Sequence, residues 1–172
     1  MRRRLNLLSG LYEFRNDSIK SSQLNKNTEV IVLVITRWNA VENRNVLRDV
    51  FKSVKQSDLS MQYKLLFLFN YPQNLTKSDV LQLAEENQKY EDLLMPNVDD
   101  NYKTVAFKLL AAFRWLSHVP MPQFKWLVKI DDDVILDLTN LDIYLSESSS
   151  NENAIHCYVN TGSPMRDIKD KW

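Results

Sequence analysis

Three consecutive carboxylates, Asp131, Asp132 and Asp133, directly follow an apolar stretch, residues 124–130, that predicts a buried strand. Adjacent carboxylates repel one another, and at the end of a buried strand this is costly unless a cation compensates. In extended backbone, Asp131 and Asp133 would point to one face and Asp132 to the other. Two carboxylates on one face suit Mg²⁺ or Mn²⁺, which prefer oxygen ligands and often complete their shell with phosphate. The alternative is an acidic surface turn.

The composition excludes several other chemistries. The chain has 172 residues, with 22 Lys+Arg against 22 Asp+Glu, so it lacks the basic excess of a typical nucleic-acid binder. Its two glycines, Gly10 and Gly162, exclude a Walker loop and a GxGxxG dinucleotide turn. A single cysteine, Cys157, excludes an internal disulfide framework and a multi-thiolate zinc site. Any chemistry must therefore rest mainly on carboxylates and cations.

Strand and helix patterns alternate along the chain. Strands are expected at 30–35, 64–69, 92–95, 124–130 and 154–159, and helices at 41–54, from a cap at Thr76 or Ser78 to about 90, 101–116 and 138–147. This order predicts an α/β domain with a mostly parallel sheet, whose strand carboxyl ends, and hence its ligand site, share one edge. The polar stretch 15–29 predicts a linker. The longest apolar run, Val30–Ile35, is too short to span a membrane, and no anchor is expected in this sequence.

Two of the predicted helices show an apolar face. The first repeats valine at four-residue spacing, with Leu47 and Phe51 beside it; its valines are Val46, Val50 and Val54. In the third, Lys108 and Arg114 are expected off the apolar face, which comprises Val105, Leu109, Ala112 and Leu116.

Two enzyme classes place carboxylates after a strand. Residues 131–134 fit the first four positions of the DxDx[TV] motif of haloacid dehalogenase phosphohydrolases, in which Asp131 would attack phosphorus. That motif normally opens its domain, whereas here only residues 134–172 follow, which leaves no room for the later motifs of that class. Metal-dependent glycosyltransferases instead carry a DxD-type site in mid-domain, after a nucleotide-binding half. The position of the acidic residues favours the glycosyltransferase.

Ordered blocks from about residue 29 to 172 resemble the β-1,3-galactosyltransferase family, glycosyltransferase family 31. The blocks are 30–36 with 42–51 (strand and "RxxIRxTW" helix), 63–70, Glu86 with 90–94 ("E...YxDil"), 100–108 ("DxYxNLTxK"), Trp115 with 124–134 ("W...kyvlKtDDDvfv"), and 164–167 with Lys171-Trp172 ("PxRd...KW"). The departures are Phe51 for Trp, 105–107 for Leu-Thr-Leu, and Lys103-Thr104 where Asn is common. In the family, a comparable length of chain normally follows and supplies acceptor contacts, the general base and a further metal ligand.

The resemblance implies a GT-A-like fold, with residues 29–172 as a partial glycosyltransferase domain preceded by a polar segment, 1–28. It also implies a metal-dependent, inverting hexosyltransferase that moves a sugar from a UDP-sugar to a glycan acceptor on a glycoprotein or glycolipid. The expected metal is Mn²⁺ or Mg²⁺. The expected location is the lumenal side of the Golgi membrane, through an anchor that this sequence lacks. A non-catalytic UDP-sugar-binding fragment is the alternative, and the general base stays unassigned.

The resemblance also assigns roles to the acidic residues. Asp133 is expected to bind the metal directly, with Asp131 as a further metal ligand. Asp131 and Asp132 are expected to contact the nucleotide. Lys129 alternates with these carboxylates along the strand and is expected to pair with one of them.

Three cations are expected to bind the nucleotide. Arg44 and Arg48 lie four residues apart, on one face of the first helix, and Arg44 is nearer the helix N-terminus, where an anion would bind. Their alternative is a solvated basic face. Lys108, at the start of the third helix, could reach a phosphate or the uracil. By contrast, Trp115 and Trp126 are expected in the core, and His156 on the late strand.

Overall fold

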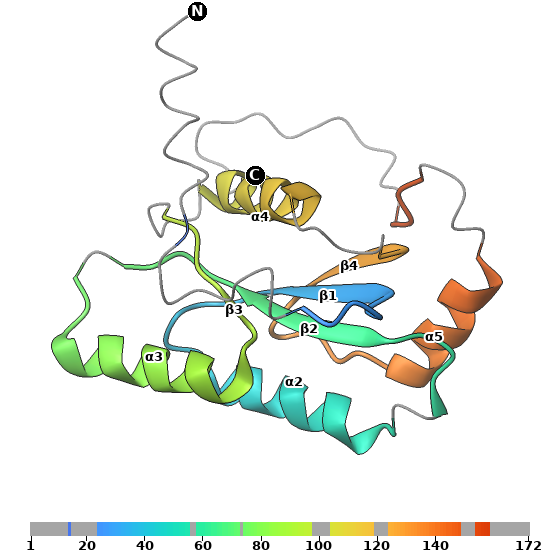
Figure 1. Cartoon of the computed structure of the whole chain (residues 1–172), viewed down its shortest axis with the longest axis horizontal. Helices are drawn as coiled ribbons and strands as arrows, with labels where there is room; N and C mark the ends of the chain where they lie inside the picture. The colour runs from blue at the N-terminus through green and yellow to red at the C-terminus, as the bar shows by residue number, and fades with distance from the viewer. Residues whose placement is uncertain are drawn as a thin grey trace, which may run out of the picture.

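The computed structural model describes residues 14, 24–55, 58–72, 74–97, 104–118, 124–148 and 154–158. Its elements are β1 (Val30–Ile35), α2 (Val41–Ser53), β2 (Tyr63–Leu68), α3 (Lys77–Tyr90), β3 (Leu93–Leu94), α4 (Val105–His118), β4 (Trp126–Asp131) and α5 (Leu138–Glu147) (Figure 1). Thr76 caps α3, as one of the two expected caps. The strand expected at 154–159 is wrong over the described residues 154–158, which form no strand. In the described part of the chain, no helix has both the length and the apolar character that crossing a membrane requires.

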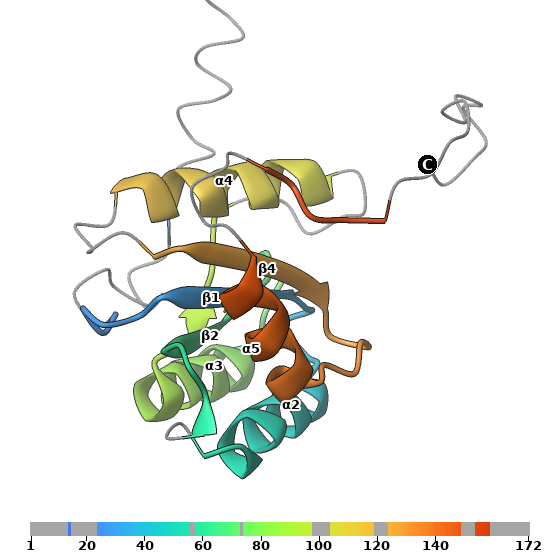
Figure 2. The same ribbon diagram turned by 90° about the vertical axis from the view of Figure 1, so that its right-hand side faces the viewer.

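The four strands form one sheet in the order β3-β2-β1-β4, and every neighbouring pair is parallel. Helix α4 covers one face, while α2, α3 and α5 lie on the other (Figures 1 and 2). The predicted α/β domain with a parallel sheet is therefore confirmed. The strand order reverses between β1 and β4, since β2 and β3 are added on one side of β1 and β4 on the other.

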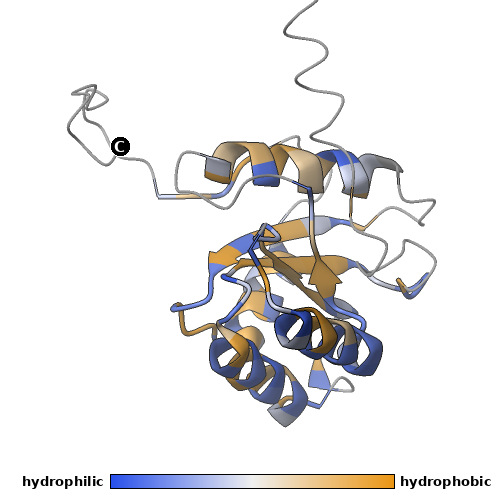
Figure 3. Cartoon of the chain, turned by 90° about the vertical axis from the view of Figure 1, so that its left-hand side faces the viewer, coloured by the Kyte–Doolittle hydropathy of each residue, from blue (hydrophilic) through white to orange (hydrophobic). Residues whose placement is uncertain are grey.

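Strand β1 is the centre of the core because both of its faces are covered. Val30, Val32 and Val34 pack in a cluster with residues of α2, α3 and α5, whereas Ile31 and Leu33 pack with residues of α4. All five side chains are fully buried, and each such burial stabilises the fold by about 1.5–3 kcal/mol. Figure 3 shows the result: the strands are mostly apolar, and the outer surfaces of α2 and α3 are hydrophilic.

The core-facing side of α2 differs from the expected valine seam. Val46 is 62% exposed, whereas Leu47 is buried and Phe51 packs against the core. The buried face also carries Arg44 and Arg48, so two arginines occupy positions that a hydrophobic pattern assigns to apolar residues. The predicted row of buried valines was therefore wrong. The two arginines can occupy the buried face because each pairs with a buried carboxylate.

Helix α4 buries Ala112 and Leu116, as expected, but Lys108 is also buried, with only 5% of its surface exposed. The expectation that Lys108 lies off the packed face is therefore wrong. Leu24, within the predicted linker, packs in the same cluster as these α4 residues. Part of the segment before β1 thus contributes to the core, and the domain boundary at residue 28 stays a prediction.

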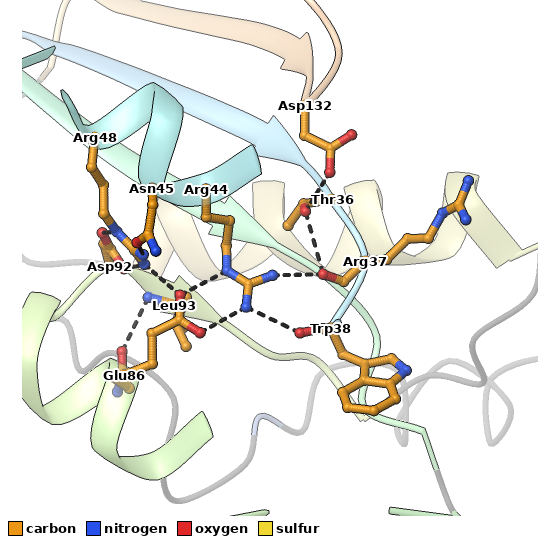
Figure 4. A network of polar contacts seen from close by, with 11 residues as sticks. Thr36, Arg37, Trp38, Arg44, Asn45, Arg48, Glu86, Asp92, Leu93 and Asp132 are labelled. Carbon is orange, nitrogen blue, oxygen red and sulfur yellow. Dashed lines mark hydrogen bonds and ion pairs between the residues drawn. The ribbon is translucent and has the colours of Figure 1, made fainter. Parts of the chain in front are cut away.

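A buried ion-pair network, defined here as Arg44, Arg48, Glu86 and Asp92, joins α2 to the end of α3 and the residue before β3 (Figure 4). Arg44 donates to both oxygens of Glu86, from Nε at 2.8 Å and from Nη2 at 2.7 Å. Arg48 donates from Nη2 to Glu86 at 2.7 Å and to Oδ1 of Asp92 at 2.8 Å, and from Nε to Oδ2 of Asp92 at 2.8 Å. Two cations thus balance two anions in the interior.

The surroundings of the network keep its groups charged. Burial by itself raises the pKa of Glu86, but the hydrogen bonds and charges of Arg44 and Arg48 outweigh it and lower that pKa below its ordinary value. Burial likewise opposes the charge of Arg48, yet Asp92 and Glu86 raise its pKa. The Arg48 guanidinium also lies 3.9 Å from the ring centre of Tyr90.

A second polar contact ties α5 to the start of β2. The buried carboxylate of Asp142 accepts from Ser60 N at 2.7 Å and Ser60 Oγ at 2.8 Å, from Met61 N at 3.3 Å, and from the Tyr63 hydroxyl at 3.0 Å. Burial alone would raise the pKa of Asp142, but these hydrogen bonds lower it overall. Burial and the neighbouring Asp142 raise the pKa of the Tyr63 hydroxyl.

We predict that Glu86→Gln lowers the free energy of unfolding by about 3 kcal/mol, because it removes a negative charge from between two buried arginines. Glu85→Gln is the matched control: Glu85 is exposed on the same helix, and its change should stay within about 0.5 kcal/mol. Urea unfolding followed by circular dichroism measures both variants. Equal destabilisation of the two would contradict a stabilising role for the network.

We predict that Asp142 makes stability depend on pH in the acid range. Its pKa is lower in the folded than in the unfolded chain, so its contribution is present above the unfolded pKa of about 3.9 and is lost as the pH falls through the folded pKa. Between about pH 5 and pH 3, the native chain should therefore lose more stability than Asp142→Asn. Urea unfolding across this range checks the difference, and parallel curves would refute it.

Candidate functional site

The acidic turn, Asp131 to Asp133, follows directly from β4. Asp131 is the last residue of the strand, and Asp132 and Asp133 lie in a turn in which Val134 N donates to the Asp131 carbonyl at 3.3 Å. The expected alternation of side chains assumed extended backbone through Asp133. It does not apply, because the strand ends at Asp131.

Contacts with β1 fix the acidic turn in place (Figure 4). The Asp132 amide donates to the Ile35 carbonyl at 3.1 Å, which continues the parallel pairing of β1 and β4 by one step. The buried Thr36 hydroxyl donates to Oδ2 of Asp132 at 2.6 Å. Asp132 is therefore held at the carboxyl end of β1, on the side where the strand order reverses.

The other two acids are more open to solvent. Asp131 forms an ion pair with Lys129 at 2.8 Å, so the expectation that Lys129 pairs with one of the carboxylates is confirmed. Asp133 is exposed, and its carboxylate makes no bond to the part of the chain that the structure describes. Among those residues, no three acidic, histidine or cysteine side chains converge as they do in a closed metal cage. The turn offers available oxygen ligands rather than a preformed cage.

Arg44 and Arg48 have structural contacts that the sequence did not predict. Both are buried, so the alternative of a solvated basic face is wrong for both. Beyond Glu86, Arg44 donates to the carbonyls of Arg37 at 2.6 Å and Trp38 at 3.0 Å, which lie between β1 and α2. It thus holds the loop that follows Thr36, and a contact of either arginine with a nucleotide stays a prediction.

The sequence contained a signal that these arginines are buried, although it did not show which acid pairs with which arginine. Glu86 and Asp92 both lie in the segment that resembles the "E...YxDil" pattern, and the arginines lie in the "RxxIR" pattern. The two patterns pair with each other in the folded chain. Charged residues at helix-core positions in one segment, matched by acids in another, were the available signal.

Two further cations lie at or near the carboxyl edge. Lys108 occupies the first turn of α4 and is buried, and its contact with a nucleotide stays a prediction. Arg37 was not singled out from the sequence. It is exposed, lies two residues beyond β1, and extends its side chain away from the buried ion-pair network (Figure 4).

A separate hollow of about 360 Å³ opens between α2 and α3 and is lined by Val41, Asn45, Gln82, Glu85, Glu86, Lys89 and Tyr90. None of the acidic turn lines it, so it is distinct from the edge of the sheet that carries Asp131 to Asp133.

His156 does not lie in a strand, but its side chain contacts Tyr144 and Trp126. Its Nδ1 lies 2.6 Å from the Tyr144 hydroxyl, and its ring meets Trp126 edge-on at a centroid distance of 5.3 Å. Trp126 and Trp115 each pack against a core cluster, which confirms the core expectation for both.

Comparison with known proteins identifies the family. The model of the galactosyltransferase family matches residues 42–172, which include the acidic turn and all four residues of the buried ion-pair network. A UDP-GalNAc:beta-1,3-N-acetylgalactosaminyltransferase 2 from Xenopus laevis is 37% identical over 86 residues, covering 49% of this chain and 17% of the relative. Human beta-1,3-galactosyltransferase 1 is 22% identical over 145 residues, covering 83% of this chain and 43% of the relative.

A third relative, UDP-GalNAc:beta-1,3-N-acetylgalactosaminyltransferase 1 from Mus spicilegus, is 28% identical over 145 residues, with 83% of this chain and 41% of the relative covered. The chain thus spans less than half the length of these relatives. The family match extends over most of the chain and agrees with the α/β fold and with the blocks noted in the sequence. The chain belongs to the galactosyltransferase family, and its described part is an α/β fold with a parallel sheet.

Proposed function

We propose that this chain forms the donor-binding part of an inverting, metal-dependent hexosyltransferase that transfers a sugar from a UDP-sugar to a glycan acceptor. The observation that carries the proposal is the acidic turn, fixed to the carboxyl end of β1 where the strand order reverses, in a chain of the galactosyltransferase family. In open parallel sheets, ligands bind at this edge and at this reversal.

The residues of the acidic turn suit a divalent metal ion. Mg²⁺ and ions like it are usually held by one or two carboxylates together with substrate phosphates and water, so a closed protein cage is not required. We assign Asp133 as the direct ligand, since its carboxylate is exposed and makes no bond to the described residues, and Asp131 as a further ligand. Bound there, Mn²⁺ or Mg²⁺ would neutralise charge on the diphosphate leaving group.

The protein's own groups would position the donor. Thr36 holds one oxygen of Asp132, which leaves the other for a nucleotide contact. Lys129 shares Asp131 with any bound ion and moderates the repulsion among the three acids. Arg44 fixes the neighbouring loop through two carbonyls. We assign no general base to these residues.

The relatives suggest the donor and the setting. Their names specify galactosyl or N-acetylgalactosaminyl transfer, so we propose UDP-galactose or UDP-N-acetylgalactosamine as the donor. A glycan of a glycoprotein or glycolipid would be the acceptor, and the lumen of the Golgi the location, as the family resemblance implies.

The same protein can be assayed for two alternative functions. In a non-catalytic domain, UDP binding would occur without sugar transfer from the protein to any offered acceptor. In a phosphohydrolase, a phosphomonoester would be turned over and Asp131→Asn would abolish that turnover. The family match favours the transferase over the phosphohydrolase.

We predict that UDP binds in the presence of Mn²⁺, and that Asp133→Asn weakens this binding by about tenfold or more, or ~1.4 kcal/mol, because it removes a charged ligand of the metal. Isothermal titration calorimetry measures both. Asp49→Asn is the matched control, since Asp49 is exposed on the middle of α2 and should leave UDP affinity unchanged.

The exposure of Asp133 makes this test specific to binding. Unfolding of Asp133→Asn should match that of the native chain, because its carboxylate supports no contact among the described residues. A native chain that fails to bind UDP with Mn²⁺, or an Asp133→Asn chain that binds it as well as the control, would reject the proposed site.

A further inference from the structure

Arg37 follows the carboxyl end of β1 at the point where the acidic turn is attached. The pairing of β1 with β4 matches Ile35 with Asp131, and the Asp132 amide continues it to the Ile35 carbonyl. Thr36, the residue before Arg37, holds the Asp132 carboxylate at 2.6 Å. The Arg37 backbone is thus a direct neighbour of the acidic turn, although the two are far apart in the sequence.

The backbone of Arg37 is anchored, while its side chain is exposed. The Arg37 carbonyl accepts from Arg44 Nη1 at 2.6 Å. Its guanidinium extends away from the buried ion-pair network and makes no bond to the residues that the structure describes (Figure 4). A fixed backbone carrying an available guanidinium is a suitable origin for a phosphate contact, since its planar fork matches phosphate oxygens.

The two other arginines of this region, Arg44 and Arg48, already donate hydrogen bonds to buried carboxylates. Arg44 donates to Glu86 and two carbonyls, and Arg48 to Glu86, Asp92 and Asn45. Moving either guanidinium to a ligand would leave buried carboxylates without their partners, which is strongly unfavourable. An exposed guanidinium has no such penalty.

The charges of the proposed site also require a further cation. The acidic turn has three carboxylates, of which Lys129 pairs with one. A divalent ion and Lys129 together do not offset these carboxylates and a bound diphosphate, and the remaining repulsion would weaken donor binding.

We propose that Arg37 binds the diphosphate of the nucleotide-sugar donor, beside the acidic turn; this rests on the proposed function. Arg37 lies outside the residues that the sequence patterns single out. It acts as a charged hydrogen-bond donor to the phosphate oxygens, and no proton is transferred.

The test uses the full chain and four proteins: native, Arg37→Ala, Arg37→Lys and Lys55→Ala. Lys55 is an exposed cation just beyond α2, near the edge at which β2 begins, so Lys55→Ala removes the same charge from the opposite end of the sheet. UDP in Mn²⁺ is titrated by calorimetry, and Mn²⁺ alone is titrated by electron paramagnetic resonance.

Arg37→Ala should weaken UDP binding by about tenfold or more, because hydrogen bonds to charged groups are lost. Arg37→Lys should lose less, since it keeps the charge without the fork. Lys55→Ala should bind UDP as the native chain does. Affinity for Mn²⁺ alone should stay equal or increase in Arg37→Ala, since a cation near the metal ligands is removed.

The outcomes separate the two proposals. If Arg37→Ala binds UDP as tightly as Lys55→Ala while Asp133→Asn does not, the role of Arg37 is overturned and the proposed function stands. If Arg37→Ala loses Mn²⁺ and UDP affinity together, the residue supports the loop and does not contact the diphosphate. If the native chain binds no UDP, the proposed function is overturned and the role of Arg37 with it.

Discussion

The pairing of Arg44 with Glu86 inside the protein is the interaction on which the arrangement of the site depends. Arg44 is fully buried, and a buried guanidinium is tolerated only when its donors are satisfied. Glu86 supplies two acceptors, and the carbonyls of Arg37 and Trp38 supply two more. Satisfying this one cation therefore joins α2, α3 and the loop after β1.

The loop after β1 in turn positions the acidic turn at the edge of the sheet. Thr36 directly follows β1 and holds Asp132, and the Asp132 amide bonds to the last residue of β1, so β1 fixes the position of the acidic turn. The buried ion-pair network is charge-balanced, whereas Asp131 and Asp133 remain exposed. This division suits a site whose ligand brings its own negative charge, because open carboxylates and an exposed arginine can respond to a metal and a diphosphate without disturbing the core.

Much of the fold could be predicted because its signals are local. The predicted bounds of β1 and of α5 are those observed. Burial on both faces gives β1 a continuous apolar block, and an amphipathic helix with a cap gives α5 a clear helical pattern. The strand expected near His156 failed because a short apolar stretch carries no local signal for a pairing partner. The valine seam of α2 failed because hydrophobic periodicity treats arginine as a surface residue.

The sequence by itself determined the alternation of strands and helices, the acidic turn after a buried strand, and the family, all of which rest on residue types and their order. The tertiary structure decided the roles of the charges whose partners lie far away in the sequence. Glu86 lies 42 positions from Arg44, and Thr36 lies 96 positions from Asp132, and neither separation carries a periodic signal. Whether a cation is buried in a pair or free for a ligand depends on which distant acid the fold brings within reach, because the energy of a charge is set by its surroundings.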